Sequence, residues 1–88
     1  GDRMRRQYER ITKARRRILE FIAKNPGLPA TTVAYRLSRN GWEETRNWAR
    51  IMWLLEHGYI YVKREGDKRR RPLYLTEKGW RAIGREPL

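Results

Sequence analysis

The chain of 88 residues contains no cysteine and only one histidine, His57. Without a thiolate it can form no disulfide, and it offers neither a thiol nucleophile nor a cysteine-liganded zinc site. A single histidine also supplies too few ligands to build a metal site. We therefore expect no bound metal and no cofactor.

Long apolar runs are also missing. No segment approaches the roughly 20 apolar residues that cross a membrane, and the basic first residues are not followed by the apolar stretch of a secretory signal. No acid, base and nucleophile are expected to converge, because the one histidine falls at a predicted helix end and the carboxylates are scattered. We expect an intracellular, cytoplasmic protein that is not an enzyme and has no membrane partner.

Acidic residues are few beside the basic ones. The chain has 10 Asp and Glu against 22 Lys and Arg, which gives a net charge of +12 and a sequence pI of about 11.1. Such a surface attracts polyanions. Seventeen of the basic residues are arginine, whose planar fork suits phosphate and guanine. The length fits one domain that buries only about 60 to 65% of its unfolded surface, a size at which a second subunit adds useful stability.

Apolar residues recur at helical spacing near the N-terminus and predict a long first helix over residues 3–24. They are Met4, Tyr8, Ile11, Ala14, Ile18 and Ile22. The opposite face carries the basic row Arg6, Arg10, Lys13 and Arg17. Thr12 allows an alternative, because it can cap a fresh helix and leave residues 2–11 as a separate arm.

The segment Asn25-Pro26-Gly27 ends this helix. A short second helix is expected over residues 29–39 and, after a turn, a third over residues 42–57 with two glutamates in its first turn. We expect the buried side of the third helix to hold Trp48, Ile51, Leu54 and Leu55. Arg46 and Trp53 should project outward, Asn47 and Arg50 should lie at the edges, and Trp42 should pack at the start of the helix.

The hydrophobic period changes after Gly58. Residues 59–63 and 73–75 are β-branched or aromatic and predict two strands, with Ile60 and Val62 on one face and Tyr59 and Tyr61 on the solvent face. A turn and a basic run between them predict a hairpin with a charged tip. Thr76 should cap a last helix that contains Trp80, Ala82 and Ile83. The expected fold class is mostly α with a small β-hairpin (α+β), comprising a helical extension at residues 1–11, one domain at 12–84 and a tail at 85–88.

Three stretches resemble parts of a known fold. Leu28-Pro-Ala-Thr-Thr-Val-Ala-Tyr-Arg-Leu37 is similar to a second helix, Leu54-Leu-Glu-His-Gly-Tyr-Ile60 to the exit of a recognition helix, and Tyr74-Leu-Thr-Glu-Lys-Gly79 to a strand-to-helix exit. In this order they resemble the winged helix-turn-helix of MarR-type and PadR-type transcription regulators. The resemblance implies a three-helix core plus a two-stranded wing, and duplex DNA as the partner.

The resemblance also implies that the third helix enters the major groove while the wing lies along the backbone or the minor groove. The candidate base readers are Thr45, Arg46, Asn47 and Arg50, since arginine can fork onto guanine and asparagine onto adenine. Asn47 and Arg50 could instead only bridge to neighbouring helices. The wing cations suited to phosphate are Lys63, Arg64, Lys68, Arg69, Arg70 and Arg71.

Regulators of these families usually add dimerisation helices. Here the stripe of Met4, Tyr8 and Ile11 has no predicted core beneath it, so we expect it to pair with its copy in a homodimer. The expected function is a sequence-specific, nucleoid-associated transcription regulator. One alternative is an architectural or replication protein without sequence preference, which the surplus of arginine favours. Another is a winged-helix module that binds protein or RNA, which an exposed Trp53 and the tyrosines favour.

Overall fold

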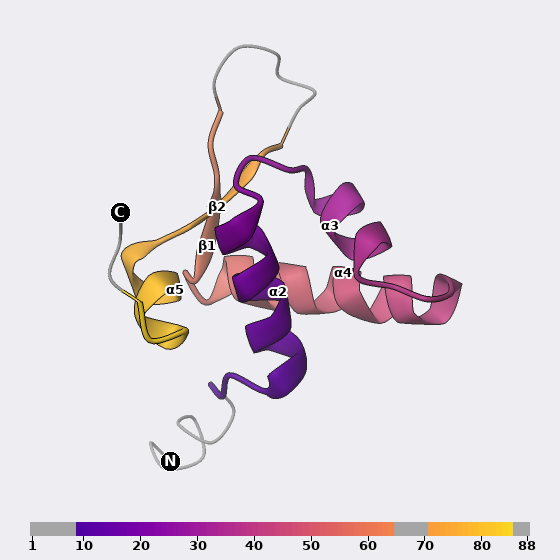
Figure 1. Cartoon of the computed structure of the whole chain (residues 1–88), viewed down its shortest axis with the longest axis horizontal. Coiled ribbons are helices and arrows are strands. Elements are labelled where there is room, and N and C mark those ends of the chain that lie inside the picture. Colours follow the sequence, from indigo (N-terminus) through magenta and orange to yellow (C-terminus); the bar gives the residue numbers. More distant parts are fainter. Residues whose placement is uncertain (1–8, 65–70, 86–88) are drawn as a thin grey trace.

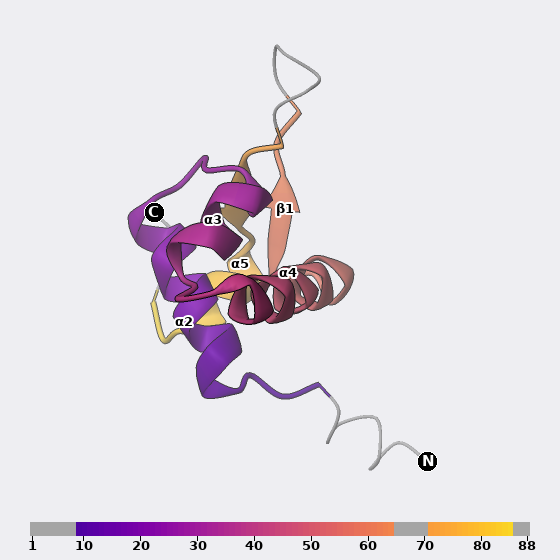
Figure 2. The ribbon, with the colours of Figure 1, turned by 90° about the vertical axis from the view of Figure 1, so that its right-hand side faces the viewer.

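The computed structural model describes residues 9–64 and 71–85. Their elements follow the order α2 (Lys13–Lys24), α3 (Ala30–Arg36), α4 (Gly41–Glu56), β1 (Ile60–Val62), β2 (Leu73–Leu75) and α5 (Glu77–Ala82). Figures 1 and 2 both show the strands projecting beyond the helices, and in Figure 1 α4 runs horizontally below α3 while α2 crosses it. In the described residues the protein is thus a small α+β domain with four helices and a two-stranded antiparallel hairpin, which confirms the expected combination of helices with a small β-hairpin.

α2, the first helix among the described residues, begins at Lys13, whereas the sequence predicted one helix continuing from residue 3. Thr12 has an extended backbone and its side chain accepts a hydrogen bond from the backbone N–H of Arg15 at 3.2 Å, the geometry of an N-cap. Residues 9–12 are not helical. The prediction of one uninterrupted helix is therefore wrong, and the alternative in which Thr12 caps a fresh helix is confirmed.

The next two helices lie close to their predicted positions. Pro29 caps α3 without a side-chain hydrogen bond, and this helix ends at Arg36, earlier than expected. α4 begins at Gly41, because the Asn40 side chain accepts a hydrogen bond from the Glu43 N–H at 2.9 Å and caps the helix. Gly58, with φ of 77°, then provides the left-handed turn that separates α4 from β1.

The hairpin has a simple register, in which Ile60 faces Leu75 and Val62 faces Leu73. The outer edge of β2 is also paired. Leu73 accepts a hydrogen bond from the Gly27 N–H at 2.9 Å and donates one to the Leu28 carbonyl at 3.0 Å. The connection between α2 and α3 therefore extends the sheet beyond the hairpin.

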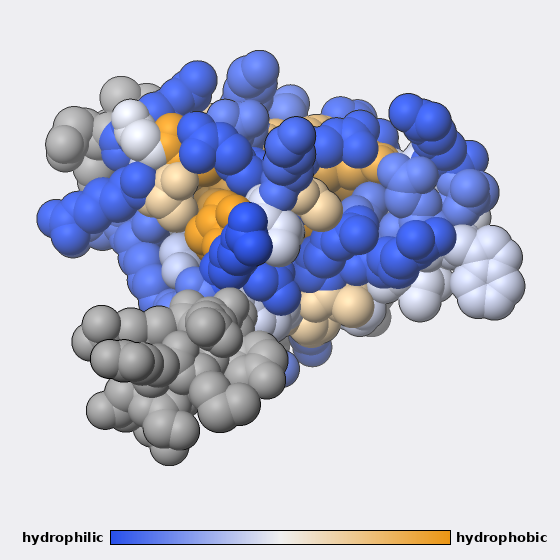
Figure 3. Space-filling model, turned by 90° about the horizontal axis from the view of Figure 1, so that it is seen from below, coloured by the Kyte–Doolittle hydropathy of each residue, from blue (hydrophilic) through white to orange (hydrophobic). Residues whose placement is uncertain are grey.

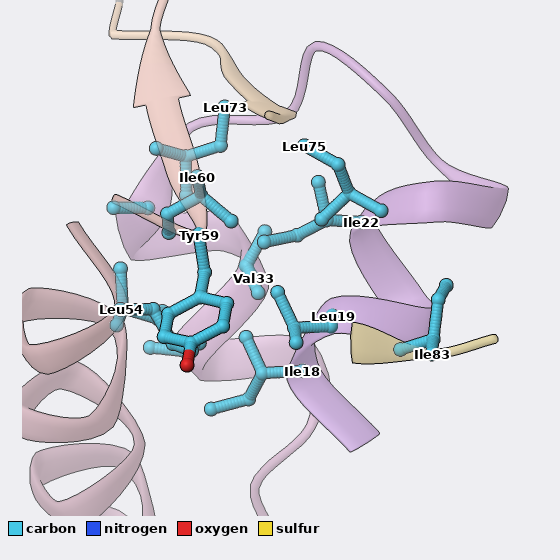
Figure 4. Packing of buried hydrophobic residues seen from close by; sticks show 13 residues of the cluster. Ile18, Leu19, Ile22, Val33, Leu54, Tyr59, Ile60, Leu73, Leu75 and Ile83 are labelled. Carbon is cyan, nitrogen blue, oxygen red and sulfur yellow. The ribbon is translucent and has the colours of Figure 1, made fainter. Parts of the chain in front are cut away.

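The hydrophobic core lies between the inner faces of the helices and the base of the hairpin (Figure 4). Its most deeply buried members are Ile18, Leu19, Ile22, Val33, Ile51, Leu54, Ile60 and Leu73. The last helix closes the core. Thr76 caps α5 by accepting from the Gly79 N–H at 3.1 Å, as predicted, and Gly79 is buried against the Tyr59 carbonyl.

Candidate functional site

The outer face of α4 is an exposed stripe, which we define as Trp42, Thr45, Arg46 and Ala49. The spacing i, i+3, i+4, i+7 places these residues along one side of the helix. α3 and α2 cover the other side. In a chain so rich in charge, this stripe contains one cation, no carboxylate and otherwise apolar or small side chains.

Arg46 is the predicted base reader that the structure leaves most available. Its side chain is exposed, and it forms no hydrogen bond or ion pair with any of the described residues. Thr45 is also exposed, but its hydroxyl donates to the Gly41 carbonyl at 3.0 Å within its own helix. The guanidinium of Arg46 is therefore the main polar group that the stripe offers to a partner.

Asn47 was expected at the edge of α4 and instead lies on the buried face of this helix. Only 4% of this residue is exposed. Its Nδ2 donates to the Ser38 hydroxyl at 2.9 Å, and its Oδ1 accepts from Arg50 at 2.8 Å. The amide is thus used inside the domain and cannot reach a base in this conformation. Asn47 occupies the bridging position that the sequence left open as the alternative to base reading.

The hairpin carries further cations just beyond its paired strands, on the side away from the core. Lys63, Arg64 and Arg71 are exposed where the two strands leave the domain. The ammonium group of Lys63 lies 5.7 Å from the centre of the Tyr74 ring, and Tyr74 stacks on Tyr61. The wing residues Lys68, Arg69 and Arg70 lie outside the described residues, so their predicted phosphate contacts stay predictions.

Several aromatic residues lie elsewhere than predicted. Trp42, expected to pack at the start of α4, is 79% exposed, and Trp48, expected on the buried side, is 41% exposed. Trp53 was expected to project outward and instead packs against the core. Tyr59 was placed on the solvent face with Tyr61 and is buried. Sequence reasoning therefore missed Trp42 and Ala49 as members of the exposed stripe.

The predicted dimer stripe is only partly described. Ile11 packs against the hydrophobic core of its own chain, whereas the prediction assumed that no core lies beneath the stripe. Met4 and Tyr8 lie outside the described residues. Pairing of two chains through the extension stays a prediction, and Ile11 no longer supports it.

Glu9, which precedes α2 in the chain, contacts residues of α5 and of the turn after α4. Glu9 accepts hydrogen bonds from the Lys78 ammonium group and, at 3.3 Å, from the Tyr59 hydroxyl. The hydrogen bond from Lys78 lowers the pKa of Glu9, and the same contact raises the pKa of Lys78. Burial raises the pKa of Tyr59. These contacts join residue 9 to α5 and to the turn after α4.

The underside of the molecule, seen in Figure 3, is covered mostly by hydrophilic side chains with small apolar areas between them. In the described ranges, no group of three or more His, Asp or Glu residues could hold a metal ion. No helix in the same ranges is long and apolar enough to cross a membrane. The exposed groups available to a partner are therefore guanidinium groups beside apolar side chains.

Comparison with known proteins does not identify the chain. No protein-family model matches it, and neither does any curated protein or solved structure.

Proposed function

We propose that this chain is a winged helix-turn-helix protein that binds double-stranded DNA and regulates transcription at specific sites. The two helices of the helix-turn-helix are α3 and α4, and the wing is the hairpin of β1 and β2. The fold family is the one that the sequence resembles, that of MarR-type and PadR-type regulators. An intracellular, nucleoid-associated location and a homodimer belong to the same proposal.

The observation that supports it best is the exposed stripe on α4. An α-helix fits the major groove of B-DNA, where arginine forks onto guanine and apolar groups contact thymine methyls. Arg46 supplies such a fork with no partner in the described part of the protein, and Trp42, Thr45 and Ala49 surround it with groups suited to methyl contacts. A stripe without carboxylates also avoids repulsion from phosphates.

The cations of the hairpin give the second line of support. Lys63, Arg64 and Arg71 are exposed next to the ends of β1 and β2, the strands that project beyond the helices (Figure 1). Cations on a projection can meet the DNA backbone while a helix lies in the adjacent groove. Contacts to phosphate fix the position of a protein on the duplex and carry no sequence information.

Salt dependence of duplex binding tests the proposal. Fluorescence titration of a labelled duplex at several salt concentrations should give a log–log slope of about −0.9 for each neutralised phosphate, and about 6 to 10 contacts are expected. A flat response would contradict DNA binding and would favour a module that binds protein through its exposed aromatic side chains. Trp42 and Tyr61, which are both exposed, are the residues that favour this second candidate.

A DNA-binding protein without sequence preference is the remaining alternative, and the surplus of arginine favours it. Selection of bound oligonucleotides from a random pool separates the two. Enrichment of a motif supports the regulator, whereas recovery of unrelated sequences with equal affinity supports the architectural protein.

A further inference from the structure

A hollow of about 240 Å³ lies between α2 and the first half of α4. Its charged lining consists of Arg17, Arg46, Arg50 and Glu43, above a floor that includes Ile18 and Leu37. Three guanidinium groups against one carboxylate leave an excess of positive charge at this place. Such a local excess attracts an anion.

The single carboxylate of the hollow offsets only one of the three positive charges, and its pairing with Arg17 is weak. Glu43 approaches Arg17 with 3.9 Å between its Oε1 and Nη1, the outer limit of an ion pair, and the Arg17 side chain is 63% exposed. Exposed pairs of this kind contribute little. Arg46 has no partner at all among the described residues.

Asn47, on the buried face of α4, holds the Arg50 side chain in place. Its Nη1 donates to Oδ1 of the buried Asn47 at 2.8 Å, and Asn47 in turn donates to the Ser38 hydroxyl. That hydroxyl donates to the Ala34 carbonyl of α3. Only one of the five N–H donors that a guanidinium carries is used in these contacts. The buried relay therefore fixes the orientation of Arg50 and leaves most of its donors for a ligand.

We propose that this hollow is a binding site for a phosphate group held by Arg17 and Arg50, which leaves Arg46 for the base contact proposed above. A phosphate presents several acceptor oxygens and negative charge, which arginine forks bind with defined geometry. The volume is several times the roughly 30 Å³ that one water occupies in the liquid, so a tetrahedral oxyanion fits. The phosphate can be free in solution or belong to a DNA backbone, and the second source rests on the function proposed above.

Titration of the full chain with inorganic phosphate tests the free source. The Nε–Hε resonances of Arg17 and Arg50 should shift saturably in NMR spectra, and sodium chloride at matched ionic strength should not reproduce the shifts. Arg50→Gln should weaken phosphate binding about tenfold, the effect of losing a hydrogen bond to a charged group. Arg81→Gln removes an exposed arginine from α5 and is the matched control, with unchanged binding.

A duplex with one neutral methylphosphonate linkage tests the DNA source. In a series that moves this linkage along the duplex, one position should weaken binding of the wild-type chain and leave Arg50→Gln unaffected. Arg50→Lys keeps the charge but loses the planar fork, so its affinity should fall between those of wild type and Arg50→Gln.

The two proposals can fail separately. If no duplex is bound, the proposed function is wrong, and the titration with inorganic phosphate alone decides whether the hollow binds phosphate. If a duplex is bound, the phosphate site is refuted when phosphate leaves the Arg17 and Arg50 resonances unmoved and Arg50→Gln binds every duplex as Arg81→Gln does. Saturable shifts or one sensitive linkage support it.

Discussion

The guanidinium carbon of Arg15 lies 3.5 Å from the centre of the Trp53 ring. Trp53 stacks in turn on His57, with 3.9 Å between the ring centres, and on Tyr59. The first turn of α2 thus covers an aromatic cluster at the end of α4. This contact explains why Trp53 belongs to the packed part of the domain and not to its exposed stripe.

Removal of this contact should destabilise the fold measurably. Arg15→Ala should lower the free energy of unfolding by about 1 kcal/mol, and Trp53→Ala by about 3 kcal/mol because ring packing is lost as well. Urea unfolding of both variants and of the double variant measures their coupling, which we expect at about 0.5 to 1 kcal/mol. Lys13→Ala, at an exposed position of the same helix turn, is the control and should cost less than about 0.5 kcal/mol. Additive losses from Arg15 and Trp53 would contradict the interaction.

Gly79 should tolerate no side chain. A Cβ atom at this position would lie 2.1 Å from the Tyr59 carbonyl oxygen, so backbone must move to admit it. Gly79→Ala should therefore destabilise the protein by about 1 to 3 kcal/mol or more, as overpacking does. Gly41→Ala is the matched control, because no atom outside its own helix lies within 4 Å of that Cβ and its change should stay within about 0.5 kcal/mol. Thermal unfolding of the two variants makes the comparison, and equal melting temperatures would show that α5 does not pack closely on the turn.

The Glu9–Lys78 contact predicts a dependence of stability on pH. The folded-state pKa of Glu9 is lowered, chiefly by the hydrogen bond from Lys78. The carboxylate therefore stabilises the fold at any pH above the ordinary pKa of glutamate, and this contribution is lost as the pH falls through the lowered pKa. The difference in melting temperature between wild type and Glu9→Gln should be largest at neutral pH and shrink in acid. A difference that is independent of pH would contradict the ionised contact.

Trp42 should matter for binding and not for folding. Because it is 79% exposed, Trp42→Ala should change the free energy of unfolding by less than about 0.5 kcal/mol. If it contacts thymine methyls, replacing thymine by deoxyuridine in a bound duplex should weaken binding of wild type more than binding of Trp42→Ala. Fluorescence titration of both proteins with both duplexes measures this, and equal losses would exclude a methyl contact by Trp42.

The order of elements could be predicted from the sequence because local signals are strong. Thr76 and Gly58 mark a helix start and a helix end through capping chemistry that needs no distant partner. Thr12 carried the same kind of signal, but the apolar spacing continued through it and favoured a longer helix. The start of α2 was therefore misplaced because two local patterns competed there.

The faces of α4 were harder to predict. Asn47 lies on the buried stripe with Ile51 and Leu54, and sequence patterns assign a polar residue to the edge of a helix. Its burial depends on the Ser38 hydroxyl, which another segment supplies. The buried stripe of α4 therefore includes Asn47 where the prediction had Trp48, and Trp48 is exposed.

The environments of two aromatic residues depend on contacts between distant segments. Trp53 is covered by Arg15 from α2. Tyr59 donates a hydrogen bond to Glu9, and the Lys78 ammonium group of α5 lies 4.4 Å from the centre of its ring. No local pattern in the sequence contains either fact.

We propose that Arg46 reads bases while the hairpin cations only hold the backbone. The direct test of this proposal compares Arg46→Ala with Arg71→Ala on the duplex selected from a random pool and on a scrambled duplex, after circular dichroism shows that both variants fold. Arg46→Ala should lose about 1 to 3 kcal/mol on the selected duplex and almost nothing on the scrambled one. Arg71→Ala should weaken both equally and reduce the salt slope by about one. Equal losses from Arg46→Ala on the two duplexes would contradict base reading by the exposed stripe of α4.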